Sequence, residues 1–135
     1  MPLPEDIRAL FAGPNYVHVA TLLPDGAPHS VPIWAGLEGE RIAFFTQAGS
    51  RKARNLAADP RVALSVTDHQ NPYSMAQVRG RVTETLEGDE ALEVIDRISI
   101  KYTGEPFAMR SGIVFLVEPE RTQSMHLPFR HSPPQ

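Results

Sequence analysis

Cysteine is absent from this chain of 135 residues. Its absence excludes disulfide bonds, thiol nucleophiles, iron–sulfur clusters and zinc sites with cysteine ligands. A chain without cysteine is compatible with a reducing compartment, and we expect a cytoplasmic location.

Long apolar runs and an excess of positive charge are also missing. No stretch approaches the ~20 apolar residues that a membrane-spanning helix needs. Glu5 and Asp6 precede any hydrophobic stretch, so the first twenty residues do not have the pattern of a signal peptide. Thirteen Lys and Arg against sixteen Asp and Glu give a net charge of −3, which argues against a generally basic surface for nucleic acid. We therefore expect neither a membrane nor a nucleic acid as a partner.

The composition is that of a globular domain. Hydrophobic residues make up 41% of the chain and charged residues 21%, which is too apolar for a disordered protein. At roughly 100–200 residues per domain, the length predicts a single domain over residues 1–135. Residues 129–135 are polar and rich in proline, and we expect this tail to be frayed.

Periodicity and turn signals predict a mainly β protein with flanking helices. The helices are expected over residues 4–11, 51–58 and 88–104. The strands are expected over residues 16–23, 27–34, 41–46, 61–67, 73–86, 113–117 and 122–127. Because most connections are short, we expect about six strands in an antiparallel sheet that closes into a small barrel.

Some segments carry more specific expectations. The nearly unbroken apolar run over residues 16–23 predicts a strand buried on both faces, or nearly so. Pro28 and Pro32 remove ladder donors from the following strand, which favours an edge or bulged strand. Residues 36–40 are expected to form a turn, and the 73–86 segment is either one long strand or two strands joined by a kink at Gly80.

The most informative stretch runs from Phe45 to Lys52, where a strand ends, Gly49 lets the chain turn and a helix begins. The N–H groups and the dipole of a helix N-terminus favour an anion. Ser50, Arg51 and Lys52 stand at this point, and their positive charges oppose the dipole unless an anion lies between them and the helix. The alternative is a serine cap followed by two solvated cations, and both interpretations remain open.

No other pattern indicates a catalytic or metal site. The five histidines show no metal-ligand spacing, and the sequence has no nucleophile elbow, no dinucleotide or phosphate loop and no convincing acid–base pair. Gln77 and Arg79 share one side of a strand, either as a site wall or as a solvated face. We therefore assign no catalytic side chain and no metal, and we expect a cofactor to carry the chemistry of any reaction.

Several short motifs follow one another in a recognisable order. They occupy residues 17–21, 24–28, 31–34, 44–46, 50–52, 55–56, 59–62 and 78–80. In this order the chain resembles the pyridoxamine 5′-phosphate oxidase-like superfamily, the flavin-binding split β-barrels, over roughly residues 5–120. The resemblance implies a six-stranded antiparallel split β-barrel with flanking helices.

Within this superfamily, the Lys-Tyr-Thr-Gly segment at residues 101–104 is similar to the small actinobacterial-type proteins that bind the deazaflavin coenzyme F420. The resemblance implies a homodimer with two cofactor sites in clefts at the interface. It assigns Ser50, Arg51 and Lys52 to the cofactor phosphate. It assigns Phe45 and Thr46 to the phosphate and ribityl region. The residues that it places along the cofactor ring are Val31, Pro32, Ile33 and Trp34.

In the flavin enzymes of this superfamily, a glutamine on the long strand reaches the cofactor from the partner subunit. Gln77 lies near that position and is included among the expected cofactor-binding residues, although counting back from Gly80 points to Met75. Residues 129–135 depart from the basic and aromatic C-terminal segment of the pyridoxamine phosphate oxidases proper, so we do not expect vitamin B6 oxidation.

The resemblance implies an oxidoreductase that transfers a hydride from reduced F420 to a small conjugated or heteroaromatic substrate. One alternative is an FMN-binding flavin reductase or oxidase of the same fold, because FMN shares the ring shape, the ribityl chain and the phosphate. Another alternative is a protein that binds a cofactor or a haem-type ligand without turnover.

Overall fold

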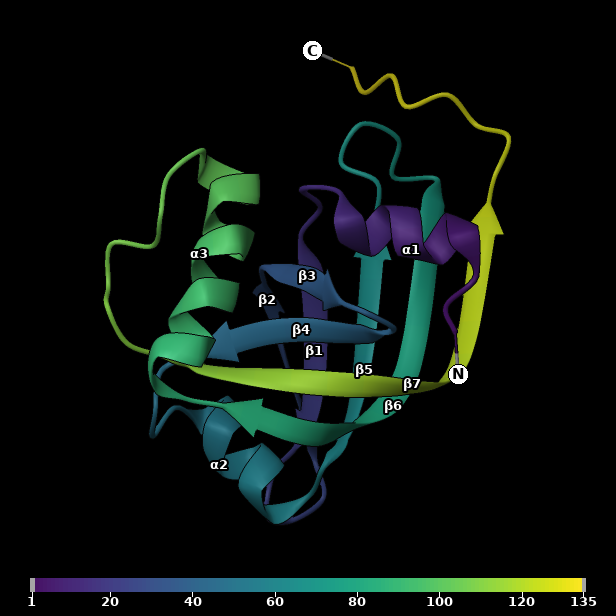
Figure 1. Ribbon diagram of the computed structural model, residues 1–135. Coiled ribbons are helices and arrows are strands. Elements are labelled where there is room, and N and C mark those ends of the chain that lie inside the picture. The colour runs from purple at the N-terminus through teal and green to yellow at the C-terminus, as the bar shows by residue number, and fades with distance from the viewer. Residues whose placement is uncertain (1, 135) are drawn as a thin grey trace.

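One antiparallel sheet of seven strands organises residues 2–134, the part of the chain that the computed structural model describes (Figure 1). The helices are α1 (Glu5–Ala12), α2 (Arg51–Ala58) and α3 (Gly88–Thr103). The strands are β1 (Val17–Leu22), β2 (Pro28–Ile33), β3 (Ala35–Glu38), β4 (Arg41–Thr46), β5 (Arg61–Thr67), β6 (Ser74–Leu86) and β7 (Ile113–His126). Their order in the sheet is β2-β1-β5-β6-β7-β4-β3, which places β2 and β3 at the two edges.

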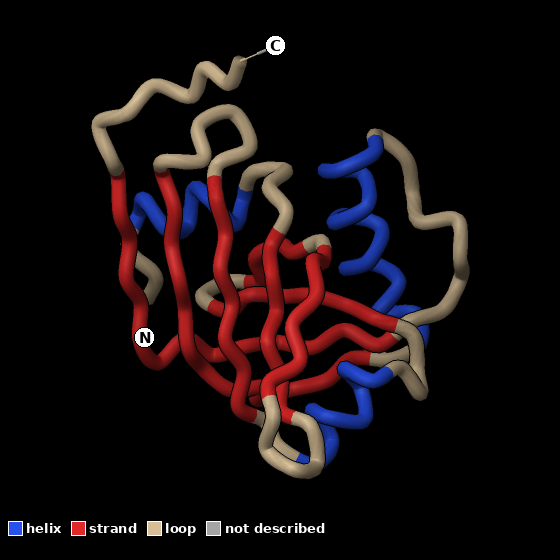
Figure 2. Tube along the Cα trace, turned by 180° about the vertical axis from the view of Figure 1, so that it is seen from behind, coloured by secondary structure: helices blue, strands red, loops and turns tan. Residues whose placement is uncertain are grey.

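The long strands β6 and β7 curve and belong to both halves of the sheet (Figures 1 and 2). β6 pairs with β5 over residues 75–81, and β7 pairs with β4 over residues 113–117. A register shift between β6 and β7 lies at Arg79 and Gly80. A Cβ atom at Gly80 would lie 2.2 Å from the carbonyl oxygen of Glu118. Only glycine therefore allows β7 to approach β6 this closely.

Two hydrophobic clusters lie on opposite faces of the sheet. The first lies inside the curved sheet and includes Ile7, Leu10 and Phe11 of α1. The second lies between the sheet and α3. Strand β4 contributes to both, because Phe44 faces the first cluster and Ala43 faces the second. The apolar sequence of β4 thus reflects a strand that is buried on both sides.

The predicted mainly β split barrel is confirmed, but two details of the strand prediction are wrong. Residues 35–38 form the extra strand β3, so the turn expected over residues 36–40 is confined to Gly39 and Glu40. Gly39 has φ +62°, and the chain pairs back on β4 after it. The two strands expected over residues 113–117 and 122–127 are one strand, because pairing with β6 continues through the intervening residues.

The expected closed barrel is also corrected, because β2 and β3 do not pair among the described residues. We call the unpaired boundary between these two edges the split. Trp34 is the single residue between β2 and β3, so the chain passes from one edge of the sheet to the other at this residue. The prediction that Pro28 and Pro32 mark an edge strand is confirmed.

Strand β1 differs from expectation in its burial. Val17, Val19 and Thr21 are buried, whereas His18 is exposed and Ala20 is half-buried. The strand therefore buries one face, and the expectation of two buried faces was wrong. Outside the sheet, Phe129 of the C-terminal tail packs against Tyr73 with ring centroids 5.3 Å apart, and the last residue of the tail lies outside the described part. No helix within residues 2–134 is both long and apolar enough to span a bilayer.

Candidate functional site

A pocket of about 340 Å³ opens at the split. Its walls are Tyr16, Pro32, Ile33, Trp34, Phe45 and Phe107. Two of these residues belong to the edge strand β2, one joins β2 to β3, and one lies near the end of β4. The unclosed sheet therefore supplies a site that is lined almost entirely by apolar and aromatic side chains. We call it the aromatic pocket.

Trp34 is the centre of the aromatic contacts around this pocket. Its ring stacks on Tyr102 of α3, with centroids 5.3 Å apart and an angle of 9° between the planes. Phe45 and Phe107 meet Trp34 edge to face at 6.4 and 6.3 Å, and they meet each other at 5.0 Å. Stacked and edge-to-face pairs at such distances are favourable and fix the rings relative to one another. The pocket thus has a rigid aromatic wall.

The stacked Tyr102 is anchored by its hydroxyl group. It donates to the carbonyl oxygen of Asn15 and accepts from the N–H of Ala35 at 3.2 Å. Burial raises the pKa of Tyr102, so the phenol stays neutral. The neighbouring Lys101 donates to the carbonyl oxygens of Phe11 and Ala35, and burial lowers its pKa to about 8. These contacts hold the end of α3 against β3 and α1.

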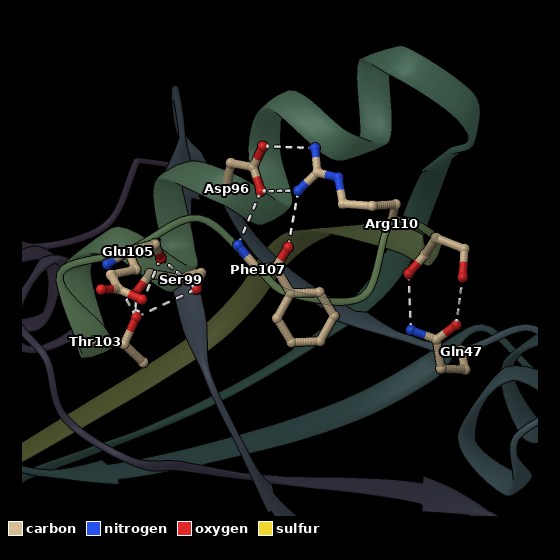
Figure 3. Close-up of polar contacts among 8 residues, drawn as sticks. Gln47, Asp96, Ser99, Thr103, Glu105, Phe107 and Arg110 are labelled. Atoms are coloured by element: carbon tan, nitrogen blue, oxygen red, sulfur yellow. Dashed lines mark hydrogen bonds and ion pairs between the residues drawn. The ribbon is translucent and has the colours of Figure 1, made fainter.

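The segment after α3 carries Phe107 to the pocket, and Asp96 holds it there (Figure 3). The N–H of Phe107 donates to Asp96 Oδ1 at 3.1 Å. Arg110 bonds both carboxylate oxygens of Asp96, at 2.9 and 3.0 Å, and also donates to the carbonyl oxygen of Phe107 at 2.8 Å. The hydrogen bonds from Arg110 are the main reason that the pKa of Asp96 is lowered. Further along, Ser111 and the side chain of Gln47 exchange two hydrogen bonds, at 3.0 and 2.7 Å.

The start of α2 lies next to the aromatic pocket. Ser50 caps the helix, because its Oγ accepts the N–H of Ala53 at 3.2 Å. The same oxygen accepts the hydroxyl of Thr46 at 3.0 Å, which ties the helix start to the end of β4. Lys52 is half-buried, its pKa is lowered by burial, and it has no ion pair within residues 2–134. The first-turn N–H groups of Arg51 and Lys52 have no partner inside the helix.

Arg51 is oriented by a buried amide. Its Nε donates to Asn55 Oδ1 at 2.9 Å, and Asn55 Nδ2 donates to Thr21 Oγ1 at 2.9 Å. Asn55 is only 1% exposed, so these bonds join α2 to β1 in the interior. The two terminal nitrogens of Arg51 make no hydrogen bond within the described chain, and the side chain lines a pocket of about 400 Å³ together with Arg54. Arg51 is thus held at one nitrogen and free to bind an anion with the others.

The structure brings most of the expected cofactor-binding residues into two adjoining groups. Pro32, Ile33, Trp34 and Phe45 line the aromatic pocket, whereas Thr46, Ser50, Arg51 and Lys52 gather at the start of α2. Val31 packs against the first hydrophobic cluster instead. Gln77 lies apart from both groups: it is bonded to Gln123 at 2.9 Å and lines a pocket of about 370 Å³ that His18 and Met75 share.

Four residues of the site escaped prediction from the sequence. Tyr16 and Phe107 complete the aromatic pocket, Asn55 orients Arg51, and Asp96 holds Phe107. Asn55 had a local signal, because a residue four positions after Arg51 lies on the same helix face. Phe107 and Asp96 had none, because their contact depends on how the chain folds back along α3.

The two groups together suit a planar ring joined to an anionic group. The aromatic wall offers stacking and edge contacts, and the helix start offers unpaired N–H groups beside two cations. A half-buried lysine without a counter-charge is unfavourable by itself, and an anion at the start of α2 removes that penalty. The residues present therefore fit a flat ring joined to an anionic group, as in a flavin-type cofactor.

Comparisons with known proteins agree with this architecture. A pyridoxine/pyridoxamine 5′-phosphate oxidase from Kineococcus radiotolerans is 39% identical over 78 residues, which are 58% of this chain and 34% of the relative. An oxidase of the same name from Cupriavidus pinatubonensis is 29% identical over 109 residues, which are 80% of this chain and 47% of the relative. The matched part of this chain thus spans less than half the length of these curated relatives.

Solved structures match over nearly the whole chain. A protein named F420 Reductase superposes with a TM-score of 0.79 and 33% identity, covering 90% of this chain and 98% of that chain. A conserved hypothetical protein from Mycobacterium tuberculosis superposes with a TM-score of 0.80 and 26% identity, covering 98% and 93%. The family model described as Pyridoxamine 5′-phosphate oxidase matches residues 3–126. Because that match takes in every helix and strand, this chain belongs to the pyridoxamine 5′-phosphate oxidase family.

Proposed function

We propose that this protein is an oxidoreductase that binds coenzyme F420 at the split and uses it to reduce a small conjugated or heteroaromatic molecule. One observation carries the proposal: two features meet at the end of β4. Phe45 lines the aromatic pocket, and the next residue, Thr46, is hydrogen-bonded to the N-cap of the cation-bearing helix α2. A ring linked to a phosphate by a short chain needs these two features side by side.

The proposed roles at the phosphate end follow from the contacts at α2. Lys52 would bind a phosphate oxygen together with the unpaired N–H groups of the first turn. Arg51 would add a second charge, presented by Asn55 through the bond to its Nε. Ser50 would act as the cap that fixes the position of this turn, because its Oγ already accepts two hydrogen bonds.

The proposed roles at the ring end are orientation and exclusion of water. Trp34 and Phe45 would border the ring, and Phe107 would cover it from the segment that Asp96 holds. The reduced cofactor, when bound, supplies the hydride. Holding the ring and the acceptor in contact in a dry pocket is then the protein's own contribution to the rate.

F420 is proposed as the cofactor because the structure named F420 Reductase is 33% identical and is matched over 98% of its length. FMN is the second candidate, and the family description together with the names of the curated relatives favours it. The aromatic pocket and the helix start suit either ring, because both cofactors join a flat tricycle to a phosphate.

The active form is proposed to be a homodimer in the cytoplasm. Gln77 and Met75 line a separate pocket on one face of the sheet, and neither residue lines the aromatic pocket of the same chain. A second copy seated on this face would bring Gln77 to the partner's cofactor. Met125 lines the same pocket as these two residues and is 44% exposed, so it would offer apolar contact to that copy.

The cofactor is tested by fluorescence titrations of the purified protein, one with F420 and one with FMN. The homodimer is tested by light scattering, which measures the mass of the protein in solution. We expect tighter binding of F420 and the mass of a dimer. The Lys52→Ala variant should weaken F420 binding by about 1.5–3 kcal/mol, roughly 10- to 150-fold, because a charge-assisted hydrogen bond is lost. The control is Arg130→Ala, which removes an exposed cation of the tail and should leave the affinity unchanged.

Two results would change the proposal. Preference for FMN would move the protein to the second candidate, with the same residues holding the phosphate. Unchanged F420 affinity in both Lys52→Ala and Arg51→Ala would overturn the phosphate assignment itself.

A further inference from the structure

A half-buried positive charge lies next to the aromatic wall, at the end of α3. The Nζ atom of Lys101 donates to the carbonyl oxygen of Phe11 at 2.9 Å and to that of Ala35. These bonds hold the ammonium group between α1 and β3, but both partners are neutral and leave its charge in place. Burial of the ammonium group is unfavourable, and an uncharged side chain of similar length would fill the same space without this cost.

The ammonium group contacts an aromatic ring of the wall. Its Nζ lies 4.8 Å from the centre of the Tyr102 ring, within the distance of about 6 Å at which a cation is attracted to an aromatic face. Tyr102 is stacked on Trp34, and Trp34 lines the aromatic pocket. The carbonyl group of Ala35, the second partner of Nζ, belongs to the residue that follows Trp34. One ring therefore connects the charge of Lys101 with the surface of the pocket.

The other charged groups around Lys101 are paired with each other. Lys101 lines a pocket of about 260 Å³ that shares no lining residue with the aromatic pocket. Arg97 of α3 and Glu38 of β3 line the same pocket and form an ion pair. The residues that α1 and β4 contribute to it, Ala12 and Ala43, are uncharged. Because the charges of Arg97 and Glu38 cancel, Lys101 sets the net charge of this pocket.

The aromatic pocket itself is lined by aromatic, aliphatic and proline side chains, so a preference for the charge of a ligand comes from groups outside this lining. A cation attracts the electrons of an aromatic face. Lys101 therefore draws electron density in Tyr102 toward itself, and through the stack it makes the face of Trp34 less negative. Such a face stacks more favourably on a ring that carries negative charge.

We propose that the aromatic pocket binds a ring with delocalised negative charge in preference to a neutral ring of the same shape, and that Lys101 is the positioning residue that sets this preference. Lys101 acts through Tyr102 and Trp34 and does not touch the ligand. A charge on the order of 10 Å from an anion changes its affinity roughly tenfold at an effective dielectric constant of about 20. We therefore expect a preference of about tenfold.

For the cofactor this preference has a direction, and this step alone rests on the proposed function. A reduced deazaflavin ring is richer in electrons than the oxidised ring, so the pocket should bind the reduced form more tightly. A roughly tenfold difference between the two dissociation constants raises the two-electron reduction potential of the bound cofactor by about 30 mV. Lys101 would thus favour retention of the reduced form and release of the oxidised form.

The test uses the full chain without added cofactor and two probes of similar shape. 2,4-Dinitrophenolate is an anion whose charge is spread over the ring, and 2,4-dinitroanisole is its neutral methyl ether. Nitroaromatic rings quench indole emission on contact, so quenching of Trp34, the only tryptophan of the chain, measures binding at the aromatic pocket. At neutral pH we expect the phenolate to bind about tenfold more tightly than the ether.

Three variants separate charge from packing. Lys101→Met should remove the preference for the phenolate and leave the affinity for the ether unchanged. Lys101→Arg keeps the charge and should keep the preference. The matched control is Arg8→Met, because Arg8 is a cation of α1 that donates to the carbonyl oxygen of Gly39 at 3.1 Å, in the turn after β3. It should leave the preference unchanged.

The natural protein provides the same test without a substitution. Neither probe titrates above neutral pH, so the preference should decline as the pH rises through about 8, where Lys101 loses its proton. Tyr102 stays neutral in this range because burial raises its pKa. A preference that is equal at pH 7 and pH 9.5, or that persists in Lys101→Met, would overturn the proposal.

Two further results would overturn it. Loss of the preference in Lys52→Ala would mean that the phenolate is held at the start of α2. Loss of the preference in Lys101→Arg would mean that the packing of the lysine matters and its charge does not. Because neither probe is a cofactor, a failure of F420 to bind would leave both results unaffected.

Discussion

The aromatic pocket has a volume of about 340 Å³, and a pocket of about 440 Å³ on the outer face of the sheet, which we call the arginine pocket, is bordered by Arg79 and Arg121. The polar groups of the two pockets are paired very differently. Around the aromatic pocket, the hydroxyl of Tyr102 has two backbone partners and Asp96 is bonded at both oxygens. Around the arginine pocket, Arg79 and Arg121 have no partner within residues 2–134. The polar supports of the aromatic wall are therefore fully paired without a ligand, whereas the arginine pair is not.

This difference determines how each pocket recognises a ligand. A wall whose polar supports are all satisfied is held in one arrangement, so it selects by shape and by stacking. A pair of unpaired cations selects by charge, and salt weakens that selection because the groups are exposed. The two pockets can therefore be disturbed independently, one through its packing and the other through its backbone and charge.

The largest effect is expected at Gly80, which positions the arginine pocket. Gly80→Ala places a Cβ atom 2.2 Å from the carbonyl oxygen of Glu118, so β7 must move away from β6. We expect the free energy of unfolding to fall by about 3 kcal/mol, because neither backbone can yield cheaply. Urea unfolding measures this loss.

Gly39→Ala is the control for Gly80→Ala. Gly39 has a left-handed backbone, with φ +62°, but nothing lies within 4 Å of its added Cβ. We expect a cost of about 1 kcal/mol from backbone strain alone, with F420 binding unchanged. Equal losses in the two variants would show that the close approach of β7 does not matter at Gly80.

How much the sequence could predict also differs between the two pockets. The start of α2 was placed correctly because a serine cap, a glycine turn and a helix period are local signals. The arginine pair could not be found in this way, because it depends on the pairing of residues 79 and 121. The sequence suggested only that Gln77 and Arg79 share a strand face, and it separated β7 into two strands at the segment that carries Arg121.

The same reasoning explains the errors at the split. β3 was taken for a turn because it is short and follows β2 after a single residue, and such a strand shows no clear alternation. Phe107 was not recognised because residues 104–112 have no periodicity, and side-chain bonds to residues far along the chain, such as Asp96 and Gln47, help to fix the position of this segment. Long-range contacts, which no local pattern encodes, decide both features.

An intermediate effect is expected at Phe107, which completes the aromatic pocket. Phe107→Ala removes two edge-to-face contacts, with Trp34 and Phe45. At about 0.5–1.5 kcal/mol for each aromatic pair, the unfolding free energy should fall by about 2 kcal/mol. Trp34 emission should shift to the red, because water reaches the indole ring.

Two variants test whether this effect comes from the pocket. Phe129→Ala removes an exposed ring of the C-terminal tail, which contacts Tyr73. It should change the free energy of unfolding by less than about 0.5 kcal/mol. Asp96→Asn keeps an oxygen for the N–H of Phe107 but removes the charge that Arg110 binds. It should reproduce part of the red shift, and an unchanged Trp34 spectrum in Asp96→Asn would refute the role of Asp96 in holding Phe107.

The smallest effect is expected from the titration of Lys101, at the support of the aromatic wall. Burial lowers its pKa in the folded protein to about 8, from an ordinary value of 10.5. Between these two values the unfolded chain binds more protons than the folded chain, so stability must rise with pH across this window. We expect a rise of about 1 kcal/mol between pH 7.5 and 9.5, because the side chain is partly exposed and water screens the full effect.

The measurement is a set of urea unfolding curves at pH 7.5, 8.5 and 9.5 for the natural protein and for Lys101→Met. Methionine keeps the length of the side chain but cannot titrate, so the difference between the two proteins isolates Lys101 from other groups. The range stops below pH 10 because the pKa of Tyr102 is raised in the folded protein. Above pH 10 its titration therefore makes the free energy of unfolding fall as the pH rises, opposite to the effect of Lys101. Parallel curves for the two proteins would mean that Lys101 is solvated in the folded state, and that its bonds to Phe11 and Ala35 do not require a buried ammonium group.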